Sequence, residues 1–367
     1  MDQETRQRID TLLDDPSIYP DRPRKSREQR EADLLAWLNT YGEVLAGYNL
    51  YGLDLVDAPD CNEYLDGGVF RKQRYEANST YIPGGCTLAW NLTTVTRDKV
   101  LFEAFADLAV GPKHHCYSYG LVNSTGYYAI HDAPARFEDL VEHFEGQQIV
   151  VKPAHSGSGV GVFVAEIQNG AFIVDNDALP AHEFLARLQS LNHPHLLQRY
   201  LIQHEFMKRA NPSSVNTIRI LSWHTGDAVH VDECASLRFG KPGVRVDNID
   251  AGGSLMFIDE NGLIGPDAFN LLDRTRFAAP LAGETLPYWT EVRAFVERIH
   301  AMIPGLFTVG WDIALTPDGP LVIEGNDGWG LDISQIPLGK GLRPRFEELL
   351  ARRKKFFAES TGQGFWS

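Results

Sequence analysis

Long apolar runs are missing from this sequence of 367 residues, and no stretch approaches the roughly 20 apolar residues needed to span a bilayer. The first ten residues, MDQETRQRID, also lack the basic-then-apolar layout that is typical of a secretory signal. We therefore expect a cytoplasmic protein that does not contact a membrane.

Cysteine and positive charge are both scarce. The four cysteines (Cys61, Cys86, Cys116 and Cys234) are too scattered for a CxxC pair or a disulfide framework, which indicates reduced thiols. Lys and Arg number 34 against 49 Asp and Glu, so the formal net charge is −15. A negative field of this kind repels polyanions, and we expect no nucleic-acid partner. The basic run at 352–355 is interpreted as solvated charge at the end of a helix.

The composition that is present, 43% hydrophobic and 23% charged, is that of an ordinary globular protein. Helical and strand-like patterns follow one another irregularly, which favours α+β subdomains over a regular βαβ alternation. Helices are expected at 27–45, 98–109, 136–144, 181–191, 288–302 and 344–357. Strands are expected at 127–130, 147–152, 160–167, 171–175, 215–223, 228–232, 235–239, 254–258, 308–315 and 320–324.

The chain divides by pattern into three parts. Residues 1–95 form an N-terminal extension with one short helix near its start, and most of 46–95 resists assignment. A central domain at 96–340 follows, and 341–367 forms a C-terminal helix and tail. We divide the central domain into a preceding segment, a glycine-loop subdomain, and a metal and substrate subdomain, at 96–146, 147–204 and 205–340.

The most distinctive local pattern is IVVKPAHSGSGVGVFV at 149–164. Its glycines are followed by a strand and not by a helix, which excludes a dinucleotide fingerprint, and the closing GK[ST] of a Walker A loop is absent. A glycine loop between two strands predicts a flap whose backbone N–H groups can point at phosphates, with Lys152 as a cation beside it. A mobile hairpin with a solvated lysine has equal weight.

A second pattern, VGWDIALTPDGPLVIEGN at 309–326, predicts two strands joined by a Pro-Asp-Gly turn. Glu324 and Asn326 share a face of the second strand, and Asp312 lies on the first. Two carboxylates and an amide oxygen are the ligands that Mg²⁺ prefers, with Mn²⁺ as a possible substitute. The alternative is an exposed polar strand end, but apolar flanks indicate burial and hence a metal or a basic partner.

Two arginines, Arg219 and Arg238, lie inside apolar strand patterns. A buried arginine needs an anion, and either a substrate phosphate or a structural aspartate would satisfy it. The segment HLLQRYLIQHE at 195–205 adds a strand that runs into polar residues, which is a weak pattern by itself.

Together and in this order, these segments resemble the ATP-grasp superfamily, and most closely its sugar-transfer-associated family. The resemblance covers roughly 95–340 and rests on Asp98-Lys99, Lys152-Pro153 with the glycine loop, 198–205, 214–219, 246–253, Gly310-Trp311-Asp312 and Glu324-x-Asn326. It implies two α+β subdomains that clasp ATP. Relatives carry an arginine two positions before the first metal ligand, where this chain has Gly310.

The resemblance also implies a role for individual residues. It makes Lys99 and Lys152 phosphate-binding lysines, Glu205 the carboxylate that holds the ribose, and Asp312, Glu324 and Asn326 the Mg²⁺ ligands. The flap and the adenine linker correspond to Ser156, Gly157, Ser158 and Gly159, and to Gln198, Arg199, Tyr200 and Leu201. We expect the substrate pocket to include Asn216, Asn248, Gly252, Gly253 and Gly328.

The function implied is an ATP-dependent ligase that joins a small-molecule carboxylate to an amine, or to a sugar-linked substrate, through an acylphosphate. Lys152 and one of the two strand arginines, Arg219 or Arg238, would act in catalysis by meeting the charge that develops during transfer. Two alternatives remain open: an ATP-grasp phosphotransferase, which makes no acylphosphate, and a catalytically silent nucleotide-binding module.

Overall fold

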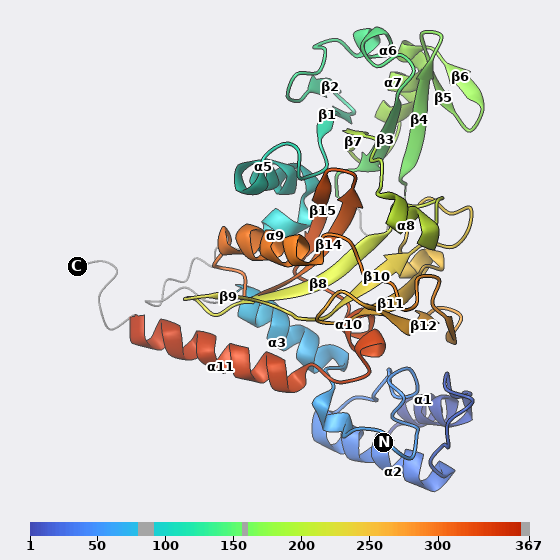
Figure 1. The fold of residues 1–367 in the computed structure, drawn as a ribbon, viewed down its shortest axis with the longest axis vertical. Helices are drawn as coiled ribbons and strands as arrows, with labels where there is room; N and C mark the ends of the chain where they lie inside the picture. The colour runs from blue at the N-terminus through green and yellow to red at the C-terminus, as the bar shows by residue number, and fades with distance from the viewer. Residues whose placement is uncertain (80–91, 156–160, 361–367) are drawn as a thin grey trace.

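Two antiparallel sheets dominate the computed structural model, which describes residues 1–79, 92–155 and 161–360 (Figure 1). The centre of the expected flap, Ser156 to Gly159, lies outside the described residues. Across the described ranges, no helix is long and apolar enough to cross a membrane. The mixed content of helices and antiparallel strands confirms the α+β class.

The smaller sheet has seven strands, in the spatial order β2 (Gly126–Ala129), β1 (Ser118–Asn123), β7 (His195–Arg199), β3 (Gln148–Pro153), β4 (Phe163–Gln168), β5 (Ala171–Val174) and β6 (Asp177–Leu179). Its core side is covered by α7 (Ala181–Gln189), η2 (Phe137–Asp139) and α6 (Leu140–His143). Along β3, Ile149 and Val151 are buried in that core. Because side chains alternate along a strand, Lys152 points to the opposite face.

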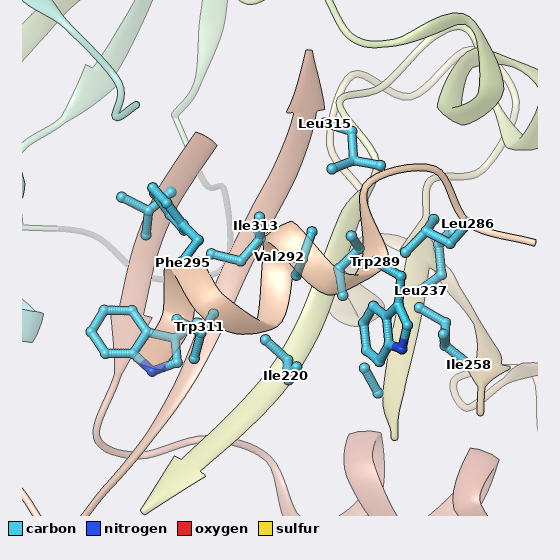
Figure 2. Close-up of a cluster of buried hydrophobic side chains, with 14 of the residues drawn as sticks. Ile220, Leu237, Ile258, Leu286, Trp289, Val292, Phe295, Trp311, Ile313 and Leu315 are labelled. Carbon is cyan, nitrogen blue, oxygen red and sulfur yellow. The ribbon is translucent and has the colours of Figure 1, made fainter. Parts of the chain in front are cut away.

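The larger sheet follows the order β13 (Thr275–Ala278), β12 (Ile264–Asn270), β11 (Ser254–Ile258), β10 (Ala235–Phe239), β8 (Thr217–His224), β14 (Thr308–Thr316) and β15 (Gly319–Asn326), and β9 (Val229–Val231) also pairs with β8. Helices α9 (Trp289–Ala301) and α5 (Lys99–Val110) cover one face. There Ile220, Trp311 and Ile313 meet Val292 and Phe295 in an apolar core (Figure 2).

The opposite face of the larger sheet is covered partly by residues from both ends of the chain. Helices α1 (Gln3–Asp14), α2 (Arg27–Tyr41), α3 (Gly67–Ser79), α10 (Leu331–Leu338) and α11 (Arg343–Ser360) contribute to this side. Trp37 and Phe70 share one buried cluster with Trp223 and Phe346. The first 79 residues therefore pack into the core of the larger sheet, while a domain boundary at residue 95 stays a prediction.

Local chemistry sets the helix ends. Ser26 and Gln29 form a capping box at the start of α2. Gly42, with φ of 75°, follows the last helical residue, Tyr41, so the helix ends four residues before the expected residue 45. Asp98 accepts hydrogen bonds from the N–H groups of Val100 and Leu101, so α5 begins at Lys99, one residue after the expected start at 98. The remaining short elements are η1 (Cys61–Glu63), α4 (Thr93–Arg97), α8 (Glu205–Ala210) and η3 (Ile249–Ala251).

One expectation about the surface is wrong. Arg353, assigned from the sequence to a solvated helix end, is 1% exposed. Its guanidinium donates to the carbonyl oxygens of His224 (2.6 Å), Pro304 (3.1 Å) and Gly305 (2.9 Å). Arg353 therefore links α11 to the end of β8, and its positive charge faces backbone carbonyl oxygens inside the fold.

Candidate active site

A cavity of about 970 Å³ is lined by residues of both sheets. Most of the residues that the sequence assigned to nucleotide, metal or substrate line it: Lys99, Lys152, Gln198, Arg199, Tyr200, Leu201, Arg219, Arg238, Asn248, Asp312, Glu324, Asn326 and Gly328. Residues separated by more than 200 positions in the chain thus meet in one cleft.

Glu205, expected at the ribose, is not part of the cavity lining. Its side chain is 83% exposed and forms an ion pair with Lys208, with 2.5 Å between the carboxylate and Nζ. Lys208 itself lines the cavity. The ribose role of Glu205 therefore stays a prediction.

Three of the expected substrate residues also lie outside the lining: Asn216, Gly252 and Gly253. The Asn216 side chain is fully buried, and its Nδ2 donates to two backbone carbonyl groups at 2.7 and 2.8 Å. A Cβ on Gly253 would come within 2.3 Å of the carbonyl oxygen of Asp247. Asn216 and Gly253 are needed for local structure here, and a role in substrate contact stays a prediction for all three.

The two acidic side chains of the expected metal site lie opposite each other on β14 and β15. Asp312 pairs with Glu324, whereas the next residue, Ile313, pairs with Val322, so Ile323 forms a bulge. The extra residue turns Glu324 to the cleft face, although Val322, two positions earlier, packs in the core under α9. Burial and then the negative charge of Asp312 raise the pKa of Glu324.

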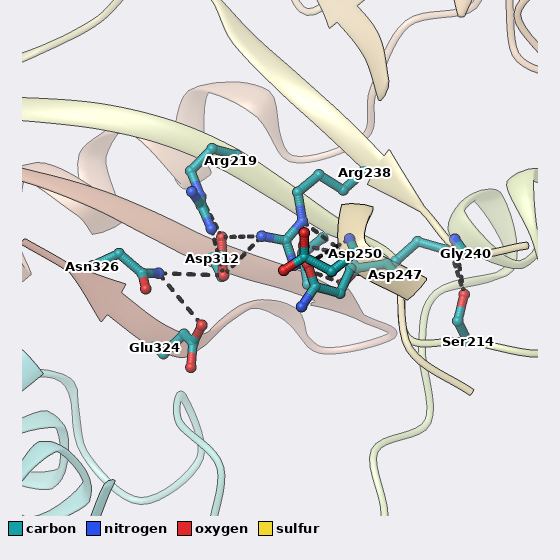
Figure 3. A network of polar contacts seen from close by, with 12 residues as sticks. Ser214, Arg219, Arg238, Gly240, Asp247, Asp250, Asp312, Glu324 and Asn326 are labelled. Carbon is teal, nitrogen blue, oxygen red and sulfur yellow. Dashed lines mark hydrogen bonds and ion pairs between the residues drawn. The ribbon is translucent and has the colours of Figure 1, made fainter. Parts of the chain in front are cut away.

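Asp312 is held by both strand arginines (Figure 3). Arg219 donates to it through Nε (2.5 Å) and Nη2 (3.0 Å), and Arg238 donates through Nη1 at 3.3 and 3.2 Å. Arg238 also donates through Nη2 to Asp247 at 2.7 Å. Burial would raise the pKa of Asp312, but the charges of Arg219 and Arg238 outweigh it and lower this pKa.

The two expected phosphate lysines come from different elements that meet at one point. The backbone N–H of Lys99, at the start of α5, donates to the carbonyl of Ala154, just past the end of β3 and Lys152. Burial lowers the pKa of Lys99, and the charge of Glu324 opposes this effect. The positive charges of both lysines in turn lower the pKa of Glu324. The cleft therefore holds two cations close to one carboxylate.

The model of the sugar-transfer associated ATP-grasp family matches residues 91–350, which is well over half of the sequence. This chain belongs to that ATP-grasp family. No curated protein matches it.

The structure of this ATP-grasp chain is similar to several solved structures. A D-alanine–D-alanine ligase from Bacillus anthracis has 12% identity over 74% of this chain and 71% of its own, with a TM-score of 0.37. An N5-carboxyaminoimidazole synthase from Aspergillus clavatus has 10% identity over 72% of this chain and 53% of its own, with a TM-score of 0.39. A D-alanyl-alanine synthetase A from Vibrio cholerae has 12% identity, covers 71% and 66% of the two chains, and has a TM-score of 0.42.

The donor set of this ATP-grasp site fits a magnesium ion that is shared with a nucleotide. Within the described ranges, no three His, Cys, Asp or Glu side chains gather into a metal cluster. The Glu324 carboxylate and the Asn326 amide both line the cavity, and Asn326 Nδ2 lies 3.4 Å from a Glu324 oxygen. Mg²⁺ commonly takes one or two protein oxygens and completes its shell with water and phosphates.

An arginine at position 310, which the resemblance to the superfamily would imply, has no room in this chain. A Cβ on Gly310 would lie 2.6 Å from Trp329 Cβ and 3.3 Å from Arg219 Cδ. Arg219 lies directly across from Asp312 on the neighbouring strand β8, so its side chain passes beside the bare backbone of Gly310. The cation beside Asp312 therefore comes from the adjacent strand.

One set of supporting residues was missed by sequence reasoning. Asp327 follows Asn326 directly and accepts hydrogen bonds from Arg97 Nε (3.0 Å) and Nη2 (2.6 Å). Asn78 Nδ2 donates to the carbonyl of Thr308 at 3.0 Å, at the start of β14. The only available signal was an acid beside a predicted metal ligand, and its partner lies about 230 positions earlier.

Proposed function

We propose that this chain is a Mg²⁺-dependent ATP ligase that joins a small-molecule carboxylate to an amine through an acylphosphate. The observation that carries the proposal is the meeting of Lys99, Lys152 and Glu324 with the Arg219–Asp312–Arg238 cluster in one cavity of about 970 Å³. Membership of the ATP-grasp family supports the use of ATP. Mn²⁺ would substitute for Mg²⁺ because both accept oxygen ligands.

In this proposal, the cations of the cleft hold the triphosphate. Lys99 and Lys152 would bind phosphate oxygens, and the loop from Ser156 to Gly159 would close over them. The linker from Gln198 to Leu201 would contact adenine through its backbone, and Glu205 would reach the ribose. Asn248 and Gly328, together with Asn216, Gly252 and Gly253, would shape the acceptor pocket. The metal, bound by Glu324 and Asn326, would neutralise phosphate charge.

The reaction needs no protein nucleophile. A substrate carboxylate oxygen attacks the γ-phosphorus of ATP, and the bond to the β–γ bridging oxygen breaks, so ADP leaves. The amine nitrogen then attacks the acyl carbon, and phosphate departs with the proton that nitrogen loses. The protein contributes orientation and fixed positive charge, which are effective in a cleft that excludes water.

Trapping with hydroxylamine tests the proposal. Purified protein would receive MgATP, a panel of small carboxylates and hydroxylamine, with ADP and hydroxamate measured together. We expect carboxylate-dependent ADP release with an equal yield of hydroxamate, and loss of both in Glu324→Gln. Phosphate found on a hydroxyl acceptor, with no hydroxamate, would identify a phosphotransferase. Nucleotide binding without any turnover would identify a silent module.

A further inference from the structure

We propose that Asp312 positions the two strand arginines and is not a ligand of the metal, so that Glu324 is the single carboxylate the metal contacts. This inference rests on the proposed function, because it concerns how the nucleotide-bound metal is held. It departs from the three-ligand site that the sequence implies. It also selects Arg219, and not Arg238, as the arginine that meets the substrate.

The hydrogen bonds of Asp312 leave little room for a metal. A carboxylate offers about four lone-pair sites. Oδ1 accepts from Arg219 Nε and Arg238 Nη1, and Oδ2 accepts from Arg219 Nη2, Arg238 Nη1 and Asn326 Nδ2 at 2.5 to 3.4 Å (Figure 3). The side chain of Asp312 is 2% exposed. A metal at Asp312 would have to displace an arginine.

Electrostatic repulsion also argues against a metal at Asp312. Arg219 and Arg238 are matched by Asp312 and Asp247, so the buried cluster has no net charge. A divalent cation on Asp312 would lie beside two guanidinium groups in a site of low dielectric, where such repulsion is strong. Freeing either arginine would leave a buried charge without its partner, which is costly.

The hydrogen-bond partners of Glu324 differ from those of Asp312. Among the described residues, no arginine donates a hydrogen bond to the Glu324 carboxylate, which faces Asp312 and lies 3.4 Å from Asn326 Nδ2. The cations that influence it most are the two lysines, which the proposed function assigns to phosphates. Glu324 would therefore remain available to the metal when the two lysines bind the phosphates of the nucleotide.

The two arginines also differ in how many of their guanidinium nitrogens already donate hydrogen bonds. All three nitrogen atoms of the Arg238 guanidinium group donate to Asp247 or Asp312. In Arg219, Nε and Nη2 are bound to Asp312, whereas Nη1 makes no hydrogen bond within the described part of the chain. Arg219 lines the cavity. Asp312 thus fixes the orientation of Arg219 and leaves one donor for an anion.

Counting metal ions on the natural sequence gives the first test. The probe is Mn²⁺ with a non-hydrolysable ATP analogue, followed by equilibrium dialysis and electron paramagnetic resonance. We expect one Mn²⁺ per chain, with the spectrum of an isolated ion. Two ions per chain with the exchange-coupled spectrum of a pair about 3.5–4 Å apart would overturn the inference. Absence of any nucleotide-dependent Mn²⁺ binding would instead contradict the proposed function.

A matched pair of variants gives the second test, because Asp312→Asn and Glu324→Gln each remove one negative charge with little change of shape. We expect Glu324→Gln to weaken Mn²⁺ binding by at least about 100-fold, the upper range for groups that only support a ligand. Asp312→Asn should change Mn²⁺ affinity less than about threefold while lowering kcat by about 10²–10³, the range for a donor to transition-state charge.

Equal loss of Mn²⁺ affinity in both variants would refute the inference and leave the proposed function standing. Nucleotide Kd should stay unchanged in Asp312→Asn, since only the orientation of Arg219 is lost; a merely structural aspartate would not separate kcat from Kd. Should Asp312→Asn fail to fold, the metal count on the natural sequence still decides.

Discussion

In the central strands β8 and β14 of the larger sheet, side chains on both faces are buried, but the two faces carry different chemistry. Along β8 and β14, every residue from Thr217 to His224 and from Thr308 to Leu315 is buried. The residues that point to α9 are mostly apolar and exclude water by packing. Those that point to the cleft include Arg219 and Asp312, which pair with each other. One strand can therefore serve a core and a charged site because its side chains alternate.

The comparison shows which face of the sheet depends on specific charged residues. On the α9 side, shape and volume matter most, apart from the buried hydrogen bonds of Ser222, His300 and Trp311, and many apolar sequences would pack there. On the cleft side, each charge needs a specific partner on a neighbouring strand, so register across β8, β10 and β14 decides whether the site exists. The predictions below test this difference, and their expected effects become smaller in turn.

The largest effect is expected from Glu324→Gln. An amide is a poorer ligand for Mg²⁺, and Glu324 is the acid that we propose holds the metal, so turnover should fall by at least about 10³-fold. Because burial raises the pKa of Glu324, loss of this charge should not lower the melting temperature. Steady-state kinetics at limiting Mg²⁺ and thermal melts would measure both. The exposed Glu291 supplies the control, Glu291→Gln; normal turnover in Glu324→Gln would remove this residue from the site.

Arg219→Lys and Arg238→Lys should separate the two arginines. Lysine cannot reproduce the planar fork, so Arg219→Lys should lower kcat by about 10²–10³ with nearly unchanged ATP affinity. Arg238→Lys should act mainly on stability, because Arg238 links Asp247 to Asp312 inside the cluster. Measuring kcat and melting temperature on both variants tests this. Equal losses of kcat would place both arginines at the transition state.

Lys152→Ala should weaken MgATP binding and keep the fold. The loss of one charge-assisted contact is worth about 1.5–3 kcal/mol, or roughly 10- to 100-fold in Kd. Lys152 lies on the cleft side of β3, away from the core of the smaller sheet, so packing should survive. Isothermal titration calorimetry would measure the change, with the exposed Lys113→Ala as the control. An unchanged Kd would show that Lys152 does not contact phosphate.

The smallest effect concerns the α9 face and pH. His300 is buried: Nε2–H donates to the carbonyl of Leu306 (3.1 Å), and Nδ1 lies 2.6 Å from Ser222 Oγ, from which the neutral ring accepts a hydrogen bond. Burial, above all, lowers the pKa of His300 to about 3. The unfolded chain binds this proton more readily, so the stability that His300 contributes is complete above its ordinary pKa of 6.5 and is lost as pH falls below that value.

The expected slope is at most about 1.4 kcal/mol per pH unit for this one group. Denaturant melts between pH 7 and pH 4 would show a flatter dependence in His300→Gln, whose amide does not titrate. His182→Gln, at an exposed position, should keep the slope of the natural sequence. An identical slope in all three proteins would show that His300 does not titrate on unfolding.

Helices and strands whose ends are marked by capping or turn residues were predictable from the sequence. The helix that begins at Lys99 has its cap in Asp98, and the strands 235–239 and 254–258 lie where the sequence indicated. Helix α3 was not predicted, because its stretch is rich in Gly, Tyr and Asn. Helix α10 was missed as well, since it contains Pro337 and packs largely through contacts made far away in the sequence. Propensity could not find elements that tertiary packing stabilises.

By itself the sequence determined the α+β class, the family and most of the residues that line the cleft, because these depend on local pattern and on motif order. Only the tertiary structure decided that Asp312 lies between two arginines, that a bulge at Ile323 turns Glu324 toward the cleft, and that Arg219 passes beside Gly310. These features depend on which strands are neighbours and in what register. A single strand cannot encode the partner of a buried charge, since that partner is chosen by pairing between strands far apart in the chain.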